Sequence, residues 1–268
     1  MAHSLAFLGS GRLASAIIRG LITKQLFPPA AIAANSKTGT TAEKLAQATG
    51  IIAEPDLARL LGPAEVVVVA FKPQSLATSD PRIAELCAGK LVISLLAGKR
   101  LARLARSFPA ARNLVRTMPN TPAAIGAGIT PYCAQQPLTD TDRRTVESLL
   151  GALGQFLQLD EQHLDAVTAL SAGGPAFLFE FVAALREAGI AAGLPADVAR
   201  QLTYETIFGS AKLLAHTGAE PEVLRDQVVS PNGTTFAGLQ VMAARQFRDT
   251  VRDTILASTR RAEELSRD

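Results

Sequence analysis

The glycine-rich turn near the start of the chain is the segment whose residue types and spacing most clearly predict chemistry. A short apolar run, Leu5–Leu8, leads directly into Gly9–Ala14, which has the spacing G-x-G-x-x-A. The first glycine permits a tight turn, the second lets the backbone approach a pyrophosphate, and the alanine lets a helix pack closely on the strand. The free N–H groups at the start of that helix favour phosphates. We therefore predict a dinucleotide-binding site formed by Gly9, Ser10, Gly11, Arg12 and Leu13.

The residues after the next apolar run, Ala31–Ala34, bear on which nicotinamide cofactor is bound. A site specific for NAD usually places Asp or Glu here to bind the ribose 2′-hydroxyl. This chain instead has Asn35, Ser36 and Lys37, which offer hydrogen-bond donors and a positive charge where a 2′-phosphate would lie. The pattern favours NADPH, with NADH as a second possible cofactor.

Two further loops should face the same crevice, because ligands in open α/β sheets lie beyond the carboxyl ends of the strands. The apolar runs Val66–Ala70 and Leu91–Leu95 each lead into such a loop. The residues that we expect to flank the ribose and nicotinamide are Ala70, Phe71, Lys72, Pro73, Ala97 and Gly98. For Lys72 the alternative is a solvated loop lysine.

Over residues 1–160, the scaffold for these loops alternates short apolar runs with amphipathic stretches. The predicted strands are Leu5–Leu8, Ala31–Ala34, Val66–Ala70, Leu91–Leu95, Asn113–Arg116 and Gly128–Tyr132. The predicted helices are Leu13–Thr23, Thr41–Ala48, Leu76–Cys87, Leu101–Ser107 and Asp140–Leu149. Continuous apolar strands are expected when helices cover both faces of a parallel sheet. The alternation predicts an α/β fold of Rossmann type with a doubly wound parallel sheet.

From Glu161 onward the strand pattern ends. The remaining segments are predicted helices, namely His163–Leu185, Pro195–Thr217, Pro221–Val228 and Thr234–Leu265. We therefore predict a dinucleotide-binding domain over residues 1–160 and an all-helical domain over residues 161–268.

Composition and charge exclude several classes of protein. The chain is 48% apolar and 19% charged, which excludes a disordered chain or a fibre. Its 27 basic residues are spread along the sequence against 24 acidic ones, so we expect no nucleic-acid partner. The two cysteines, Cys87 and Cys133, are expected to be free thiols in a reducing compartment.

The apolar stretch Ala166–Leu185 is long enough to span a bilayer. Gly173-Gly174-Pro175 interrupts it, however, and a buried helix at a subunit interface explains the same composition. The first residues lack the pattern of a secretory signal. We therefore expect a cytoplasmic protein without a membrane span.

Three polar segments follow the cofactor loops and suggest a family. They are Arg116–Pro122 with its Asn120, Ser171–Ala176, and Ser230–Thr235 ahead of a long C-terminal helix. Together with the Gly9 turn and Ala70–Pro73, their order resembles the pyrroline-5-carboxylate reductases of proline biosynthesis. The resemblance implies NAD(P)H-dependent reduction of the cyclic imine L-1-pyrroline-5-carboxylate to L-proline. It also implies a helical domain that builds a homodimer, often assembled into a decamer.

The resemblance also suggests where the substrate binds. The N–H groups of Gly233, Thr234 and Thr235 would bind its carboxylate at a helix start, with Ser171 as a further substrate contact and Asn120 as a cofactor contact. The Thr235 hydroxyl is our candidate catalytic group, placed to orient the imine nitrogen or relay a proton. Its alternative role is a helix cap. No metal is expected, because the three histidines are far apart in the sequence.

The chain departs from the family pattern at four positions. Gly173 replaces a serine, Phe177 a tyrosine, Asn232 a glycine, and Leu57 an asparagine. We expect these departures to affect affinity for cofactor and substrate more than the class of reaction. Asn232 would need a backbone conformation with positive φ, which asparagine tolerates better than most residues.

Two other functions remain open from the sequence. A reductase of another imine or of a β-hydroxyacid could use the same two-domain plan, with Lys212 as a candidate helical lysine. A non-enzymatic redox sensor that binds NADP would need no anion-binding loop at Ser230–Thr235. Alanine at Lys212 would distinguish the hydroxyacid chemistry from pyrroline reduction.

Overall fold

The computed structural model describes residues 3–267, and the chain divides into two compact units. The second unit spans Gly174–Ala257, and the first comprises the residues before and after it. The sequence predicted a division between residues 160 and 161. The first unit extends to Gly173 because Leu164 and Ala169 are fully buried in it.

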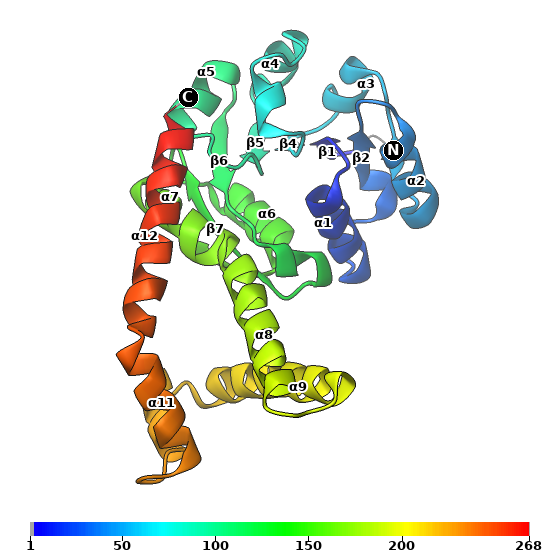
Figure 1. Ribbon diagram of the computed structural model, residues 1–268. Coiled ribbons are helices and arrows are strands. Elements are labelled where there is room, and N and C mark those ends of the chain that lie inside the picture. Colours follow the sequence, from blue (N-terminus) through cyan, green and yellow to red (C-terminus); the bar gives the residue numbers. More distant parts are fainter. Residues whose placement is uncertain (1–2, 268) are drawn as a thin grey trace. The chain divides into compact units, whose positions relative to one another are not determined.

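The first unit is built on an eight-stranded sheet in the order β3-β2-β1-β4-β5-β6-β7-β8 (Figure 1). The strands are β1 (Leu5–Leu8), β2 (Ile32–Asn35), β3 (Ile52–Ala53), β4 (Val66–Val69), β5 (Leu91–Ser94), β6 (Asn113–Thr117), β7 (Gly128–Ala134) and β8 (Gly154–Gln158). All neighbouring strands pair in parallel except β6 and β7, which are antiparallel. The prediction of a doubly wound parallel sheet is confirmed, except that the β6–β7 pair is antiparallel.

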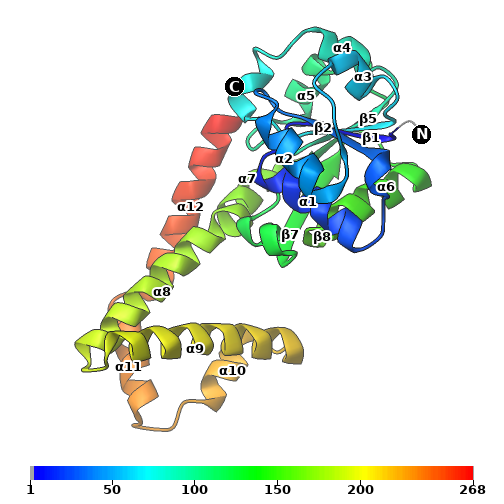
Figure 2. The ribbon, with the colours of Figure 1, turned by 90° about the vertical axis from the view of Figure 1, so that its right-hand side faces the viewer.

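Helices cover both faces of this sheet. They are α1 (Arg12–Thr23), α2 (Thr40–Thr49), α3 (Leu57–Leu61), α4 (Arg82–Leu86), α5 (Leu101–Ser107), α6 (Asp140–Gly151) and α7 (Leu164–Val167). Short helical turns are η1 (Pro29–Ala31), η2 (Pro73–Leu76), η3 (Thr121–Ile125), η4 (Glu161–His163) and the π-helical turn η5 (Thr168–Ala172). Figure 2 shows α1 and α6 on one side of the sheet and α3, α4 and α5 on the other.

Side chains alternate between these two layers along each strand, as they must in a pleated sheet. In β1, Leu5 and Phe7 pack in the same core cluster as Ile17 of α1. Ala6 and Leu8 join the opposite cluster. Both faces are therefore buried, which explains why the strand is a continuous apolar run.

Several element boundaries differ from the sequence prediction. The predicted helix Leu76–Cys87 is instead η2 and the short α4, because Pro81 cannot donate a backbone hydrogen bond there. The predicted helix Thr234–Leu265 is broken between α11 and α12 at Gln246, whose φ is +52°. Two strands, β3 and β8, were not predicted.

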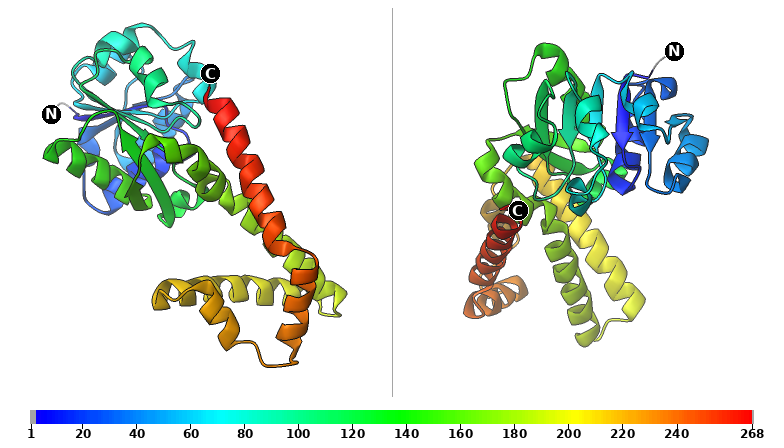
Figure 3. Two further views of the ribbon diagram at one scale, coloured as in Figure 1. Left: turned by 90° about the vertical axis from the view of Figure 1, so that its left-hand side faces the viewer. Right: turned by 90° about the horizontal axis from the view of Figure 1, so that it is seen from above.

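The second unit is helical, as predicted. It contains α8 (Gly174–Ala191), α9 (Ala196–Thr217), α10 (Pro221–Gln227) and α11 (Thr234–Ala244), and the first part of α12 (Phe247–Ser266). Figure 3 shows α8 beside α9, and α12 as one continuous helix that contributes to both units. Of residues 174–257, all of which are described, only Ala199 and Thr203 are buried. This unit therefore has almost no core of its own.

Large apolar side chains remain exposed on these helices. Phe179 is 62% exposed, Phe208 58% and Val228 69%. Within the described residues, the helical stretch Glu161–Ala191 is long and apolar enough to cross a membrane by length and composition alone. Apolar surface on this scale marks a surface that another molecule covers.

Both cysteines are free, as predicted, and both are buried. Burial raises the pKa of Cys87 and of Cys133 to about 12. Because only the thiolate reacts, we expect neither cysteine to react with a thiol reagent near about pH 8 in the folded protein. Unfolding in denaturant should make both react. Rapid modification of the native chain would contradict the burial of these side chains.

Candidate active site

The glycine-rich turn between β1 and α1 has a geometry that only glycine at position 9 allows. Gly9 has a φ of +107°, and a Cβ there would lie 2.9 Å from the carbonyl carbon and oxygen of Ala70 and from the Phe71 nitrogen. Ala70 in turn donates its backbone N–H to Leu8 at 2.9 Å. The end of β4 therefore lies directly against the turn, with no room for a side chain.

The start of α1 leaves its backbone donors free for an anion. Gly11 is the N-cap residue, and no side chain caps the helix. A Cβ on Gly11 would meet no heavy atom within 4 Å. The open space, the free N–H groups and the cation of exposed Arg12 together fit a dinucleotide pyrophosphate.

A cavity of about 1050 Å³ opens beside this turn, entirely within the first unit. Its volume is in the range of cofactor sites in proteins. The predicted residues that line it are Ser10, Gly11, Arg12, Leu13 and Asn120. It is also lined by Arg19, Thr41 and Lys44, which the sequence analysis missed. The sequence gives little indication that these three residues line a site, because they lie on helices rather than in the loops that follow strands.

The β2–α2 loop is tied to the glycine-rich turn. The Asn35 side-chain oxygen accepts a hydrogen bond from the Gly9 N–H at 3.1 Å. Ser36 Oγ accepts from Ala42 N at 3.3 Å, which leaves its proton available. Lys37 is exposed. Asn35 thus shapes the turn, while Ser36 and Lys37 can face a ligand in this loop.

A second, smaller cavity of about 360 Å³ lies at the ends of β4 and β5, also within the first unit. Three predicted residues, Pro73, Ala97 and Gly98, line it. Asp165 and Thr168, which the sequence analysis did not select, also line it. Phe71 is half-buried and packs against the core, whereas Lys72 is exposed.

The amide of Asn120 is only partly engaged. Its oxygen accepts a hydrogen bond from the Ile129 N–H at 3.1 Å, at the start of β7. The NH₂ group makes no hydrogen bond among the described residues, so it can donate into the larger cavity that Asn120 lines.

The candidate substrate residues are divided between the two units. Ser171 lies in the π-helical turn η5 of the first unit. Its Oγ is buried without a hydrogen-bond partner among the described residues. The loop that contains Gly233, Thr234 and Thr235 lies in the second unit, so the structure does not bring it together with Ser171 within one unit.

The loop before α11 presents free backbone donors. Gly233 is the N-cap residue, and no side chain caps this helix. Asn232 has a φ of +59°, so it adopts the left-handed conformation expected for an asparagine at this position. Thr235 is the second helical residue rather than the cap, and its exposed hydroxyl makes no hydrogen bond within the described chain. The helix-cap alternative for Thr235 is therefore wrong.

Lys212, the residue that could support hydroxyacid chemistry, is engaged elsewhere. Its Nζ lies 4.2 Å from the centre of the Phe208 ring on the same helix. This is a cation–π contact and does not indicate a catalytic lysine.

A doubly wound sheet with an anion-binding first turn, joined to a helical unit with exposed apolar faces, defines an NAD(P)-dependent oxidoreductase that assembles through its helices. The family model "Pyrroline-5-carboxylate reductase dimerisation" matches residues 161–265. The pyrroline-5-carboxylate reductase of Synechocystis is 34% identical over 270 aligned positions, which cover 100% of both chains. The chain belongs to the pyrroline-5-carboxylate reductase family.

Further matches agree with this assignment. The model "NADP oxidoreductase coenzyme F420-dependent" matches residues 4–98. The Arabidopsis thaliana pyrroline-5-carboxylate reductase is 33% identical, with 98% of this chain and 95% of that protein covered. A solved pyrroline-5-carboxylate reductase from Coxiella burnetii has a TM-score of 0.92 at 29% identity, covering 99% of both chains. A Plasmodium falciparum pyrroline carboxylate reductase solved with NADP bound has a TM-score of 0.84 at 26% identity, covering 98% of both chains.

The dimerisation match explains the exposed helices. It begins at residue 161, where the sequence predicted the helical domain to start, and it includes the apolar stretch Glu161–Ala191. The protein is a homo-oligomer.

Proposed function

We propose that this protein reduces L-1-pyrroline-5-carboxylate to L-proline with NADPH, the last step of proline biosynthesis. The observation that carries the proposal is the 34% identity to a reductase of that name over the full length of both chains. The anion-binding turn at Gly9 and the second anion-binding helix start at Gly233 give the reaction its two required sites. NADPH is the preferred cofactor, because Asn35 stands where a site specific for NAD has a carboxylate, and NADH is the second candidate.

The first unit is proposed to bind the cofactor, which supplies a hydride when bound. The backbone donors at Gly11, Arg12 and Leu13 would bind the pyrophosphate. Ser36 and Lys37 would bind the 2′-phosphate. Asn120, whose NH₂ group is free, and the loops that contain Ala97 and Gly98 would bind the nicotinamide half.

The helix start of α11 is proposed to bind the substrate carboxylate. The Gly233 N–H donates to the Ser230 carbonyl oxygen at 3.0 Å and would have to share this hydrogen bond with the substrate. The N–H groups of Thr234 and Thr235 have no capping side chain to satisfy them, and the positive end of the helix dipole favours an anion. The Thr235 hydroxyl would orient the imine nitrogen or donate a proton to it. A protonated imine accepts hydride without building negative charge, so positioning of the two reactants is the main contribution of the protein. Ser171 would supply a further hydroxyl to the bound substrate.

For assembly we propose a homodimer formed by the helical domain over residues 161–268, with five dimers able to form a decamer. The exposed apolar side chains of α8 and α9 support an interface of this kind. We also propose that the protein works in the cytoplasm, without a membrane and without nucleic acid. The interface explains the apolar helix Glu161–Ala191 without a bilayer.

Turnover with matched substrates tests the proposal. We expect NADPH to be oxidised rapidly with pyrroline-5-carboxylate, to give L-proline, and more slowly or less tightly with NADH. The cyclic imine 1-pyrroline, which lacks the carboxylate, should have a KM at least about tenfold higher, because the α11 anion site then binds nothing. A β-hydroxyacid should not be a substrate. Absence of any turnover with pyrroline-5-carboxylate, despite binding of NADPH, would refute the proposed reaction.

A further inference from the structure

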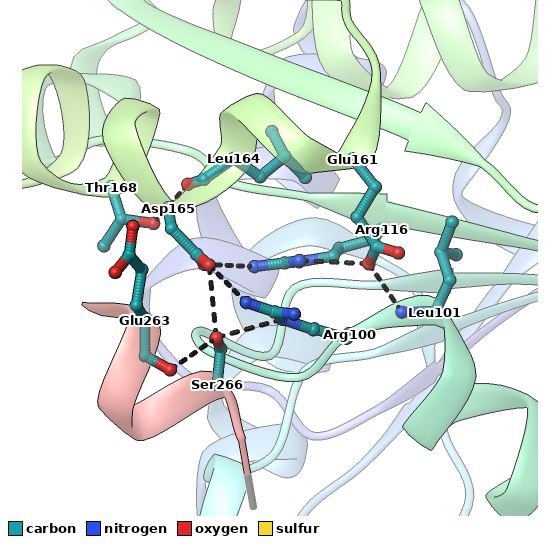
Figure 4. Close-up of polar contacts among 9 residues, drawn as sticks. All are labelled: Arg100, Leu101, Arg116, Glu161, Leu164, Asp165, Thr168, Glu263 and Ser266. Carbon is teal, nitrogen blue, oxygen red and sulfur yellow. Dashed lines mark hydrogen bonds and ion pairs between the residues drawn. The ribbon is translucent and has the colours of Figure 1, made fainter. Parts of the chain in front are cut away.

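A buried ion network lies at the end of β6 (Figure 4), and its member Asp165 lines the smaller cavity of the first unit. The Arg116 side chain is only 2% exposed, and its guanidinium contacts Glu161 at 3.0 Å and Asp165 at 3.4 Å. Such a buried cation is tolerated only when carboxylates surround it. Arg116 directly precedes the Thr117–Asn120 segment at the larger cavity.

Asp165 joins both arginines of the network to Ser266. Its second oxygen contacts the Arg100 guanidinium at 2.8 Å and the Ser266 hydroxyl at 3.2 Å. Arg100 also donates its Nε–H to Ser266 at 3.0 Å. In Figure 4 the Asp165 carboxylate faces both guanidinium groups and the serine. One carboxylate therefore joins β6, the start of α5, α7 and the last turn of α12.

Asp165 and its partner Ser266 lie on the two chain segments that connect the units. α7 and η5 lead to Gly173, where the chain leaves the first unit, and α12 returns it at Ser258. Asp165 is on the outgoing segment and Ser266 on the returning one, so their contact fixes both connections to the first unit.

The same network borders the loop proposed to hold the nicotinamide. Arg100 follows Gly98 by two residues, and a Cβ on Gly98 would lie 3.6 Å from the carbonyl oxygen of Leu265 in α12. Asp165 itself lines the smaller cavity together with Ala97 and Gly98. The two connecting segments and the Ala97–Gly98 loop, all within the first unit, thus meet at the same side chain.

We propose that Asp165 is a positioning residue of the reductase, an inference that rests on the proposed function. By binding Arg100, Arg116 and Ser266 together, it holds both connections to the helical unit in register with the Ala97–Gly98 loop. Its carboxylate is occupied by these partners, so it acts through them and does not touch the reacting atoms. Hydride transfer depends steeply on the alignment of the two reactants, so loosening this register lowers kcat.

Asp165→Asn keeps the shape of the side chain but removes its charge. We expect kcat to fall about tenfold or more. The KM for NADPH should stay within about twofold, because the residues proposed to bind its pyrophosphate and 2′-phosphate do not belong to the network. Hydrogen exchange in the full oligomer should accelerate in residues 164–173 and 258–267. Asp165→Glu, which restores the carboxylate, should recover part of the lost kcat.

Asp142→Asn is the matched control. The Asp142 side chain is 7% exposed against 10% for Asp165, and it pairs with the half-buried Arg112. It lies on α6, away from both cavities. The Asp142→Asn variant should have a lower free energy of unfolding than the wild type and an unchanged kcat. If Asp165→Asn does not fold, Ser266→Ala removes only one branch of the network and should show the same two effects more weakly.

The outcomes separate this proposal from the proposed function. An equal loss of kcat in Asp142→Asn and Asp165→Asn would overturn it as a general stability effect. Unchanged exchange in both connecting segments, or a rise in the KM for NADPH with kcat intact, would also overturn it. If the wild type reduces no pyrroline-5-carboxylate, the reductase proposal fails, while exchange at the two segments still decides whether Asp165 anchors them.

Discussion

Alanine at Gly9 is expected to weaken NADPH binding roughly 100-fold and to lower the thermal stability of the protein. The residue has a φ of +107°, a conformation that costs a side-chain-bearing residue about 1–3 kcal/mol. The new Cβ would also lie 2.9 Å from the Ala70 carbonyl, and this backbone group cannot rotate away as a flexible side chain could. A loss of about 3 kcal/mol corresponds to roughly a 100-fold fall in affinity. Titration of the variant with NADPH and a thermal unfolding curve measure the two effects.

Gly11→Ala is the matched contrast to Gly9→Ala. Gly11 has a φ of −72° and open space around its Cβ position, so alanine there should leave the unfolding temperature of the free protein almost unchanged. The added methyl group would occupy the space through which a pyrophosphate approaches, and NADPH affinity should fall about tenfold or more. Unchanged NADPH binding by Gly11→Ala would show that the pyrophosphate lies elsewhere.

Thr235→Ala is expected to lower kcat about 10- to 100-fold with little change in stability or in the KM for NADPH. The hydroxyl is exposed and makes no hydrogen bond within the described chain, so its removal breaks no contact of the free subunit. A loss of turnover would therefore report on the substrate. Steady-state kinetics with pyrroline-5-carboxylate, beside a thermal unfolding curve, measure both quantities.

Two companion variants sharpen that experiment. Thr235→Ser keeps the hydroxyl and should retain most of the activity. Ser210→Ala removes another exposed helical hydroxyl of the second unit and should have no effect. Full activity in Thr235→Ala would show that the Thr235 hydroxyl takes no part in the reaction. The loop would then act on the substrate only through the backbone N–H groups at the start of α11.

The parts of the fold that the sequence predicted are those with a strong local signal. All six predicted strands are present with their ends shifted by at most two residues. Four of them, β1, β2, β4 and β5, are the mainly apolar runs expected of buried parallel strands. The glycine-rich turn was equally visible, since Gly9 is required by its backbone conformation alone.

The elements that were missed depend on contacts distant in sequence. β3 has two residues, and β8 is an exposed edge strand that pairs with β7. Neither has a periodic apolar pattern that would distinguish it from a loop. The break at Gln246 is a single residue with positive φ, without the glycine or proline that usually marks such a break.

The candidate site shows the same division. Loop residues after strands were predictable, because the sheet topology places them at one edge. Thr41 was not predictable, because its place in the site depends on a contact with a distant residue: its hydroxyl lies 2.8 Å from that of Ser10. Nor was the Arg116–Asp165 network, because an arginine in a strand and an aspartate in a helix are individually unremarkable until the fold buries them together.

The transfer of a labelled hydride tests the central claim most directly. With NADPH carrying deuterium at the transferable position of its nicotinamide, the protein should convert pyrroline-5-carboxylate to L-proline with one deuterium at the δ carbon, the former imine carbon. Mass spectrometry and NMR of the product identify that position. Oxidation of the cofactor without deuterium in proline would contradict the account, because the hydride would then have gone to another acceptor.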